Sequence, residues 1–333
     1  MGAAVRANAH AQSASRTPTA AQPLGASTDL VRLDVSVLDK RGNFVGGLAK
    51  GQFRVLDNGV QQPIVFFAPV EAPARVLVMI ETSPAVYLIH DEHLSAAYAL
   101  LQGLDPADQV ALVTYSNQPR EALGFTADKS AFLGVLNSLQ YTIGMGTLNF
   151  YDSLAAVMDH FGAAEGKSAV VLLTTGIDSS PASHWEPLVR KLRGTDVVIF
   201  PVALGGVLRE DASTAARRKK RAKEAAPVDS PESDSLGELT GFARANRALT
   251  LLGQITGGRA YFPQSDRDFA PMYRQIASAL RHQYVLGIAP AHDGQFHALS
   301  VQISPNGGDG AKKPPKKSPY RIFAREGYVA PGH

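Results

Sequence analysis

A short stretch near residue 80 carries oxygen-bearing side chains of the kind that build metal sites. The segment 75-RVLVMIETSPAVY-87 runs from an apolar stretch of strand length into a loop that begins with Glu81, Thr82 and Ser83. Carboxylate and hydroxyl oxygens are the ligands that Mg²⁺ prefers, in a near-octahedral shell with water at open positions. The loop is therefore a candidate cation site, and a partner could bind through that cation.

The elements that hold this loop alternate between strand and helix after Pro73. Apolar runs of strand length occur at 75–81, 109–116, 168–176, 196–204 and 259–263. Apolar residues at helical spacing occur at Leu94, Ala97, Tyr98 and Leu101, at Tyr151, Leu154, Ala155 and Met158, and within 269–282. Because the strand runs are continuously apolar, both faces of their sheet must be buried. The pattern predicts a mostly parallel sheet covered by helices on both sides.

Alternating, β-branched segments lie at both ends of the chain. They are 30-LVRLDVSVLD-39 and 52-QFRVLDNGVQQPIVFF-67 before the α/β region, and 283-QYVLGIAP-290, 296-FHALSVQIS-304 and 320-YRIFAREGYVA-330 after it. Asn58-Gly59 predicts a two-residue type I′ hairpin. Isolated sheets of two or three strands are marginally stable. We therefore expect the two ends to pair with each other into one sandwich-like module.

The domain organisation follows from these patterns. We expect a flexible tail or export-signal remnant at 1–27 and an N-terminal β segment at 28–72. An α/β domain should span 73–282, with a mobile charged insertion at 206–242, and a C-terminal β segment at 283–333 should pair with 28–72. Ala9-His10-Ala11 fits a signal-peptidase site, although no apolar stretch precedes it. This favours an exported, periplasmic or extracellular protein, with the cytoplasm as the alternative.

Composition narrows the function classes. The 333 residues carry 33 Lys and Arg against 30 Asp and Glu, an excess too small to indicate a nucleic-acid partner. The basic runs 217–223 and 312–317 fit solvated loops, although the role of Arg217 to Lys223 stays open. The chain has no cysteine and no apolar run of the roughly 18 residues that a transmembrane helix needs. It contains neither a G-x-S-x-G elbow nor an H-E-x-x-H pair, and we expect no enzymatic activity.

Several motifs together resemble the von Willebrand factor type A fold, and more closely the VWFA-related family of Acidobacteria. They are 34-DVSVLDKRGNFVGGL-48, 53-FRVLDNGV-60, 108-DQVALVTYS-116, 146-GTLNFYDSL-154, 171-VLLTTG-176, 257-GGRAYFP-263, 281-RHQYVLGIAP-290 and 326-EGYVAP-331. The resemblance implies an α/β fold with a doubly wound, mostly parallel, six-stranded sheet flanked by helices. Beside it we expect the β-sandwich-like module built from the N- and C-terminal strands.

The resemblance also implies a metal-ion-dependent adhesion site, in which D-x-S-x-S, a Thr and a later Asp bind Mg²⁺. Glu81 stands at the first Asp, Ser83 and Thr147 match, and Ala85 and Thr175 replace the second Ser and the late Asp. The longer Glu81 side chain displaces the carboxylate, while Ala85 removes a ligand and Thr175 removes a charge. We therefore expect a degenerate site without a tightly bound cofactor. A weak Mg²⁺ site at Glu81, Ser83 and Thr147, completed by the partner, is the alternative.

Ligands of such sheets bind at the carboxyl ends of the strands, where the strand order reverses. The crevice expected there is formed by Glu81, Thr82, Ser83, Pro84, Thr147, Asn149, Thr175 and Asp178. In the absence of metal, Ser83 and Thr147 should bond to loop backbone groups, and Glu81 should be solvated or paired with a cation. Asp178 is expected in a loop turn or at the cap of the next helix.

The sequence predicts a non-catalytic protein-interaction module that binds a protein partner through this top face and the adjacent β module. One alternative is a structural subunit of a membrane-associated, envelope or extracytoplasmic assembly. The other is a Mg²⁺-dependent adhesion protein with an altered ion site.

Overall fold

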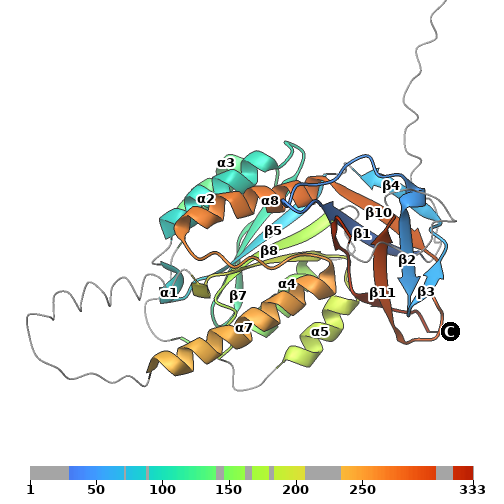
Figure 1. The fold of residues 1–333 in the computed structure, drawn as a ribbon. Coiled ribbons are helices and arrows are strands. Elements are labelled where there is room, and N and C mark those ends of the chain that lie inside the picture. Colours follow the sequence, from blue (N-terminus) through green and yellow to red (C-terminus); the bar gives the residue numbers. More distant parts are fainter. Residues whose placement is uncertain are drawn as a thin grey trace, which may run out of the picture.

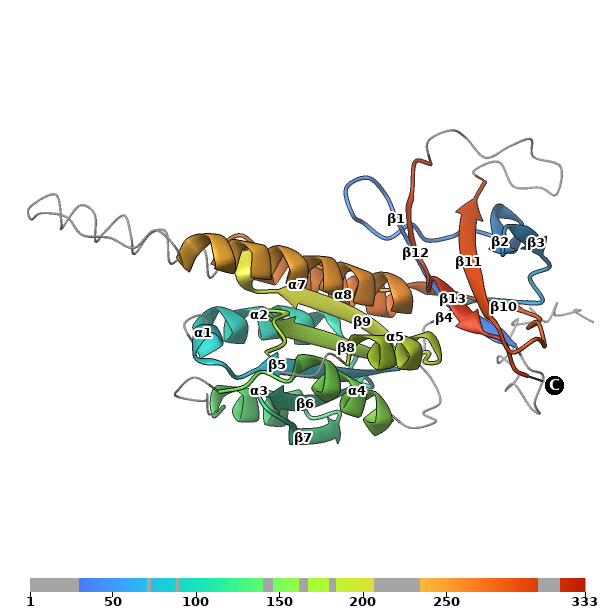
Figure 2. The same ribbon diagram turned by 90° about the horizontal axis from the view of Figure 1, so that it is seen from below.

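The computed structural model describes residues 30–70, 73–87, 90–139, 146–161, 167–179, 184–206, 234–304 and 318–332. A helix-flanked sheet lies beside a smaller module of antiparallel strands (Figures 1 and 2). The predicted tail at 1–27 and both basic runs lie outside the described residues. None of the helices in the described part of the chain combines the length and the apolar character that spanning a bilayer requires.

Within the described residues, the central sheet has five strands in the order β7-β6-β5-β8-β9. Their bounds are β5 Ala74–Glu81, β6 Gln109–Tyr115, β7 Pro119–Thr126, β8 Lys167–Thr174 and β9 Val198–Ala203. All neighbours are parallel except β7, which pairs antiparallel with β6. The prediction of a mostly parallel sheet is confirmed, but the prediction of six strands is wrong. The run 259–263 contributes only a single bridge, from Tyr261 to Val202.

Helices cover both faces of this sheet, as the continuously apolar strands predicted (Figures 1 and 2). One face carries α2 (His90–Gly103), α3 (Lys129–Asn137) and α8 (Phe269–Arg281), and the other carries α4 (Phe150–Phe161), α5 (Trp185–Arg193) and α7 (Asp234–Thr256). Val76 and Val78 of β5 face the first layer, whereas Leu77 and Met79 face the second. The helix α7 begins inside the stretch 206–242, so the expected mobile insertion is helical from Asp234 onward.

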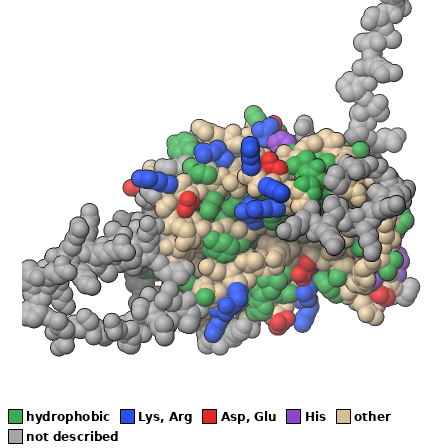
Figure 3. All heavy atoms as spheres, in the orientation of Figure 1, with side chains coloured by type: hydrophobic (Ala, Val, Ile, Leu, Met, Phe, Trp, Pro, Cys, Tyr) green, Lys and Arg blue, Asp and Glu red, His purple; other side chains and the backbone are tan. Residues whose placement is uncertain are grey.

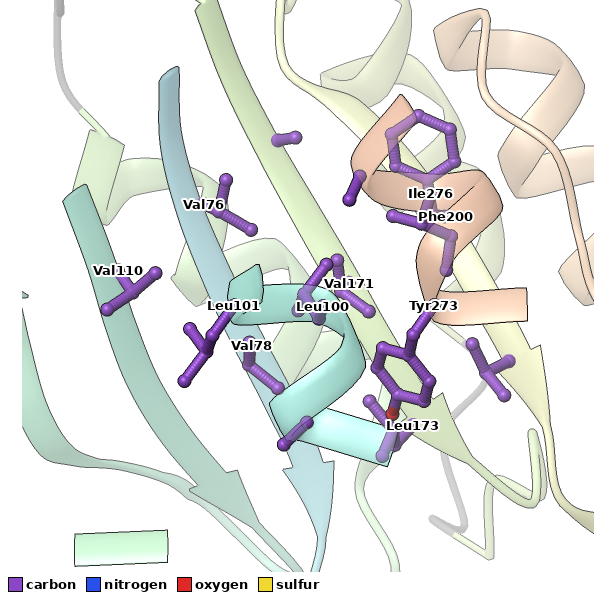
Figure 4. Packing of buried hydrophobic residues seen from close by; sticks show 14 of the residues in the cluster. Val76, Val78, Leu100, Leu101, Val110, Val171, Leu173, Phe200, Tyr273 and Ile276 are labelled. Carbon is purple, nitrogen blue, oxygen red and sulfur yellow. The ribbon is translucent and has the colours of Figure 1, made fainter. Parts of the chain in front are cut away.

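The first helical layer packs closely on the sheet. Figure 4 shows Leu100 and Leu101 of α2 and Tyr273 and Ile276 of α8 gathered over the strands. Where α2 and α8 meet, a Cβ atom added to Gly103 would lie 2.3 Å from the Cβ of Ala277. Only a glycine therefore allows these two helices to approach so closely at this point.

The antiparallel module is a sandwich of two four-stranded sheets, β12-β1-β10-β4 and β13-β11-β2-β3. The bounds are β1 Val31–Leu38, β2 Phe53–Asp57, β3 Val60–Gln62, β4 Phe66–Val70, β10 Gln283–Ile288, β11 Phe296–Ile303, β12 Arg321–Phe323 and β13 Gly327–Val329. N-terminal β1 pairs with C-terminal β10, and β2 pairs with β11. The predicted fold, in which N- and C-terminal strands build one sandwich, is confirmed. The short elements are α1 (Pro84–Tyr87), η1 (Lys50–Gln52) and η2 (Asp266–Asp268).

The turn between β2 and β3 has the predicted geometry. Asp57 pairs with Val60, so that Asn58 and Gly59 form a two-residue turn. Their φ angles are 47° and 83°, and a type I′ turn requires positive φ at both positions.

The C-terminal segment joins the sandwich to the helical layer of α5 and α7. Arg325 pairs with Asp196 at 2.7 Å and donates to the carbonyl oxygen of Arg193 at 2.8 Å. Arg193 in turn pairs with Glu326 at 2.9 Å, and its guanidinium lies 4.4 Å from the centroid of the Phe296 ring. These contacts fix the orientation of the sandwich relative to the central sheet.

A histidine between two carboxylates ties the N-terminal strands to the C-terminal ones. The Nδ1 atom of His297 lies 2.7 Å from Asp57, and its Nε2 atom lies 3.1 Å from Asp293. Tyr328 donates a further bond to Asp57 at 3.0 Å, and the Asn58 amide lies 3.3 Å from the Nδ1 atom of His297. The hydrogen bond to Asp57, followed by the one to Asp293, raises the pKa of His297. Both ring nitrogens can donate only in the protonated imidazolium, so this arrangement favours the charged form.

The glycine at the α2–α8 contact yields a paired prediction. Gly103→Ala should lower the free energy of unfolding by about 1–3 kcal/mol, because the added methyl overpacks the contact with Ala277. Gly134→Ala in α3 is the matched control, since a Cβ atom there has no neighbour within 4 Å. That change should raise stability by up to about 1 kcal/mol through helix propensity. Urea denaturation of both variants measures the effects, and a stabilising Gly103→Ala would contradict the packing.

The His297 cluster predicts a pH-dependent stability. Because the pKa of His297 lies above the unfolded value of about 6.5, its contribution is complete below that pH and fades as the pH rises through the folded value. The loss of unfolding free energy caused by His297→Gln should therefore be larger at pH 5.5 than at pH 9. Denaturation of wild type and variant at both pH values tests this, and a loss independent of pH would show that the ion pairs contribute nothing.

Candidate functional site at the carboxyl ends of the strands

The candidate loop leaves the sheet at the carboxyl end of β5, between the ends of β6 and β8. Glu81 is the last residue of β5 and has no solvent exposure. Thr82 and Ser83 follow it and are also buried, at 6% and 7% exposure. The Thr82 backbone amide and hydroxyl both donate to the carbonyl oxygen of Tyr115, at 2.9 Å and 3.1 Å. The loop is therefore held against the end of β6.

The carboxylate of Glu81 accepts hydrogen bonds on both oxygens. Its Oε1 atom accepts from the Ser83 hydroxyl at 2.6 Å. Its Oε2 atom accepts from the Thr175 backbone amide at 2.7 Å and from the Thr175 hydroxyl at 2.8 Å. The end of β5 is thus bonded directly to the residue that follows β8.

Two further hydroxyls complete the surroundings of Glu81. The Oε2 atom lies 3.1 Å from the Thr174 hydroxyl and 3.2 Å from the Tyr115 hydroxyl, which are themselves 2.5 Å apart. Burial of the Tyr115 ring and the neighbouring negative charge of Glu81 both raise the pKa of this phenol well above its ordinary value. The phenol therefore keeps its proton. Thr174 also accepts from the backbone amide of Gly176 at 2.8 Å, which extends the network into the loop after β8.

This network corrects the expected surroundings of Glu81 and Ser83. Glu81 is neither solvated nor paired with a cation, because none of the ion pairs among the described residues involves it. Ser83 bonds to the Glu81 side chain rather than to loop backbone. The prediction did not include Tyr115 and Thr174 in the site. A signal for them was present, since both lie at the carboxyl ends of the runs 109–116 and 168–176, which flank β5 in the sheet.

The residues at this position do not fit the magnesium ion of the adhesion site. Four donors surround the Oε2 atom of Glu81 and the Ser83 hydroxyl donates to Oε1, so a cation at this carboxylate would have to displace donors that already contact it. Thr147 is exposed and forms no hydrogen bond with the Glu81 network. In the described part of the chain, no three His, Asp or Glu side chains are placed to hold a metal ion together. The hydroxyls and the amide at the ends of the strands stabilise the carboxylate in place of a cation.

The two loops expected to line the crevice do meet. The Leu148 amide donates to the Ser179 hydroxyl at 2.7 Å, and the Ser179 amide donates to the Leu148 carbonyl at 2.8 Å. Asp178 accepts from the Tyr151 amide at 2.9 Å, in the first turn of α4, rather than capping the next helix. The Asn149 amide donates to the Ser116 carbonyl at 2.8 Å and joins the end of β6 to the same assembly.

The predicted crevice therefore divides into a buried floor and an accessible rim. Glu81, Thr82, Ser83 and Thr175 form the floor. Pro84 and Thr147 are exposed, and Asn149 and Asp178 are half-buried. The side chain of Ala85 lies outside the described set. Only the rim is available to a partner.

Comparison with known proteins is consistent with this geometry. Residues 78–240 match the family model of the von Willebrand factor type A domain. No curated protein matches the chain.

Three solved structures resemble the chain distantly. An aerotolerance-related membrane protein from Bacteroides fragilis shares 12% identity over 61% of this chain and 98% of its own, with a TM-score of 0.43. The ArnB paralog VWA2 from Sulfolobus acidocaldarius shares 13% over 90% and 76%, with a TM-score of 0.40. The PilB minor pilin from Streptococcus sanguinis shares 11% over 64% of each chain, with a TM-score of 0.43. On the match of residues 78–240, this chain contains a von Willebrand factor type A domain.

Proposed function

We propose that this protein is a non-catalytic interaction module that binds a protein partner through the rim of the crevice and the adjacent sandwich, without a tightly bound metal. Domains of this type commonly mediate protein–protein interactions. The observation that carries the proposal is that Glu81 is buried and accepts hydrogen bonds from protein groups on both carboxylate oxygens. Because the carboxylate is engaged in these hydrogen bonds, it is not available to bind a cation. A partner would then contact the exposed residues of the top face directly.

The same observation argues against catalysis at this position. A general base must come within hydrogen-bond reach of the proton that it removes. Glu81 has no solvent exposure, and its oxygens already accept bonds from Ser83, Tyr115, Thr174 and Thr175. A substrate could reach the carboxylate only by displacing these groups.

The hydrogen bonds among the floor residues hold the exposed rim in one conformation, which favours binding of a partner to a surface that is already ordered. Thr147 and Pro84 stand on loops that are joined, through Asn149, Ser179 and Thr175, to the ends of three central strands. A surface that is ordered before binding avoids part of the entropy cost of association. The sandwich is fixed to the same body by Arg325, so both surfaces meet a partner in one orientation.

We place this module in an envelope or extracytoplasmic setting. The support is the signal-peptidase-like Ala9-His10-Ala11, which lies outside the described residues.

The hydrogen bonds of Glu81 in the crevice floor should stabilise the folded protein. Glu81→Ala removes the acceptor of five hydrogen bonds and leaves a cavity, so it should lower the free energy of unfolding by about 2–5 kcal/mol. Glu81→Gln keeps the shape of the side chain but turns an NH₂ group towards other donors. It should lower the free energy of unfolding by about 1–3 kcal/mol. The control Glu186→Gln changes an exposed carboxylate of α5 and should cost less than about 1 kcal/mol. Equal urea midpoints for Glu81→Gln and Glu186→Gln would show that the network does not stabilise the fold.

If the rim of the crevice binds the partner protein, a substitution on the rim should weaken that binding. Thr147→Arg places a bulky charge on the exposed rim and should reduce partner recovery at least about tenfold in quantitative cross-linking from cells of the source organism, since a misplaced charge at an interface costs several kcal/mol. Ala107→Arg is the matched control, because Ala107 is exposed in the loop before β6, at the opposite end of the sheet. Both variants should keep the wild-type melting temperature. Recovery that survives Thr147→Arg would place the binding surface elsewhere.

A further inference from the structure

A second concave site lies next to the crevice, between the β6–β7 turn and the end of α3. This cleft has a volume of about 620 Å³. Its lining includes Thr82, Ser116, Asn117, Gln118 and Arg120. Thr82 belongs to the crevice floor, and Ser116 accepts the amide of Asn149. The cleft and the crevice rim are therefore parts of one continuous top face.

The cleft is rich in hydrogen-bond donors that are not used within the protein. Among the described residues, the side chains of Ser116, Asn117, Gln118 and Arg120 have no hydrogen-bond or ion-pair partner. Asn117, Gln118 and Arg120 are exposed, and Ser116 is half-buried. The Arg120 guanidinium alone offers five N–H groups in a fork that matches a carboxylate.

The lining carries a single sign of charge. Among the described residues that line the cleft, Arg120 is the only charged one, and none is Asp or Glu. The neighbouring acidic residue, Glu121, does not contribute to the lining, consistent with the alternation of side chains along a strand. Elsewhere, on the face shown in Figure 3, basic and acidic side chains are interspersed. A lone unpaired Arg among neutral amides and hydroxyls is complementary to an acidic group.

The shape of the site favours an extended segment of chain. The cleft opens at the start of β7, which is the edge strand of the sheet (Figure 2). Edge strands present unpaired backbone groups, and extended peptides commonly dock along them. We infer that the cleft binds an extended acidic segment of the partner protein, with Arg120 holding an Asp or Glu side chain. This inference rests on the proposed function and specifies the chemistry of its partner.

A displayed library of random seven-residue peptides tests the inference without knowledge of the natural partner. Peptides selected on the wild-type chain should be enriched in Asp and Glu, and selection on Arg120→Gln should lose that enrichment. Arg274→Gln is the matched control, because Arg274 is exposed on α8 and has no ion-pair partner among the described residues. It should keep the enrichment.

The most enriched peptide is then synthesised and its affinity measured by fluorescence anisotropy. Arg120→Gln should weaken binding about tenfold or more, as should replacement of the peptide's acidic residues by their amides, because each change removes a charge-assisted hydrogen bond. Applied together, the two changes should weaken binding little more than either alone. An absence of binding peptides, a selection without acidic enrichment, or equal affinity for Arg120→Gln and wild type would each overturn the inference. The rim can still bind a partner in these cases, since Thr147→Arg tests that function separately.

Discussion

The top of this protein depends on one interaction, the burial of the Glu81 carboxyl group among hydroxyl groups. An isolated carboxylate in a protein interior costs several kcal/mol, and it must be compensated by opposite charge or by hydrogen bonds. Glu81 receives five bonds, from groups located at the ends of β5, β6 and β8. The carboxyl ends of three central strands are consequently held together by their own side chains. A metal ion would have to displace these donors before it could bind.

The connectivity of the chain places this top face on a rigid body. The chain leaves the sandwich through β4, builds the helix-flanked sheet, and returns through α8 into β10, which pairs with β4. The domain is thus inserted between two adjacent strands of the sandwich. Arg325 and Glu326 add ion pairs between the sandwich and the α5 region. A change in the orientation of one module relative to the other would break these ion pairs.

The sequence predicted those parts of the molecule that follow from periodicity and turn chemistry. Continuous apolar runs predicted the parallel strands, and Asn58-Gly59 predicted a hairpin that requires positive φ at both positions. The edge strand β7 was not predicted, because its sequence 119-PREALGFT-126 has no continuous apolar run. The strand is half-exposed and carries Arg120 and Glu121. Helix α7 was missed because it begins in a charged, Ser-bearing stretch.

The site was predictable in position but not in chemistry. Glu81, Ser83 and Thr175 follow strands whose ends must meet, so their proximity could be inferred. Whether Glu81 faces solvent, a cation or hydroxyls depends on which side chains close over it. The hydroxyl groups of Tyr115 and Thr174 lie against the Glu81 carboxylate. The orientation of these two side chains is set by three-dimensional packing rather than by spacing in the sequence. The cleft at Arg120 likewise arises from a strand that lacked any sequence signal.

Hydroxyl groups and a backbone amide, not a metal ion, complete the surroundings of Glu81. A crystal structure of the protein grown in excess Mn²⁺ tests it most directly, because Mn²⁺ scatters anomalously and prefers oxygen ligands as Mg²⁺ does. We expect no anomalous peak within coordination distance of Glu81, and we expect the bonds from Ser83 and Thr175 to be retained. A peak at about 2.0–2.2 Å from a Glu81 oxygen, with those hydroxyls displaced or coordinated, would contradict it.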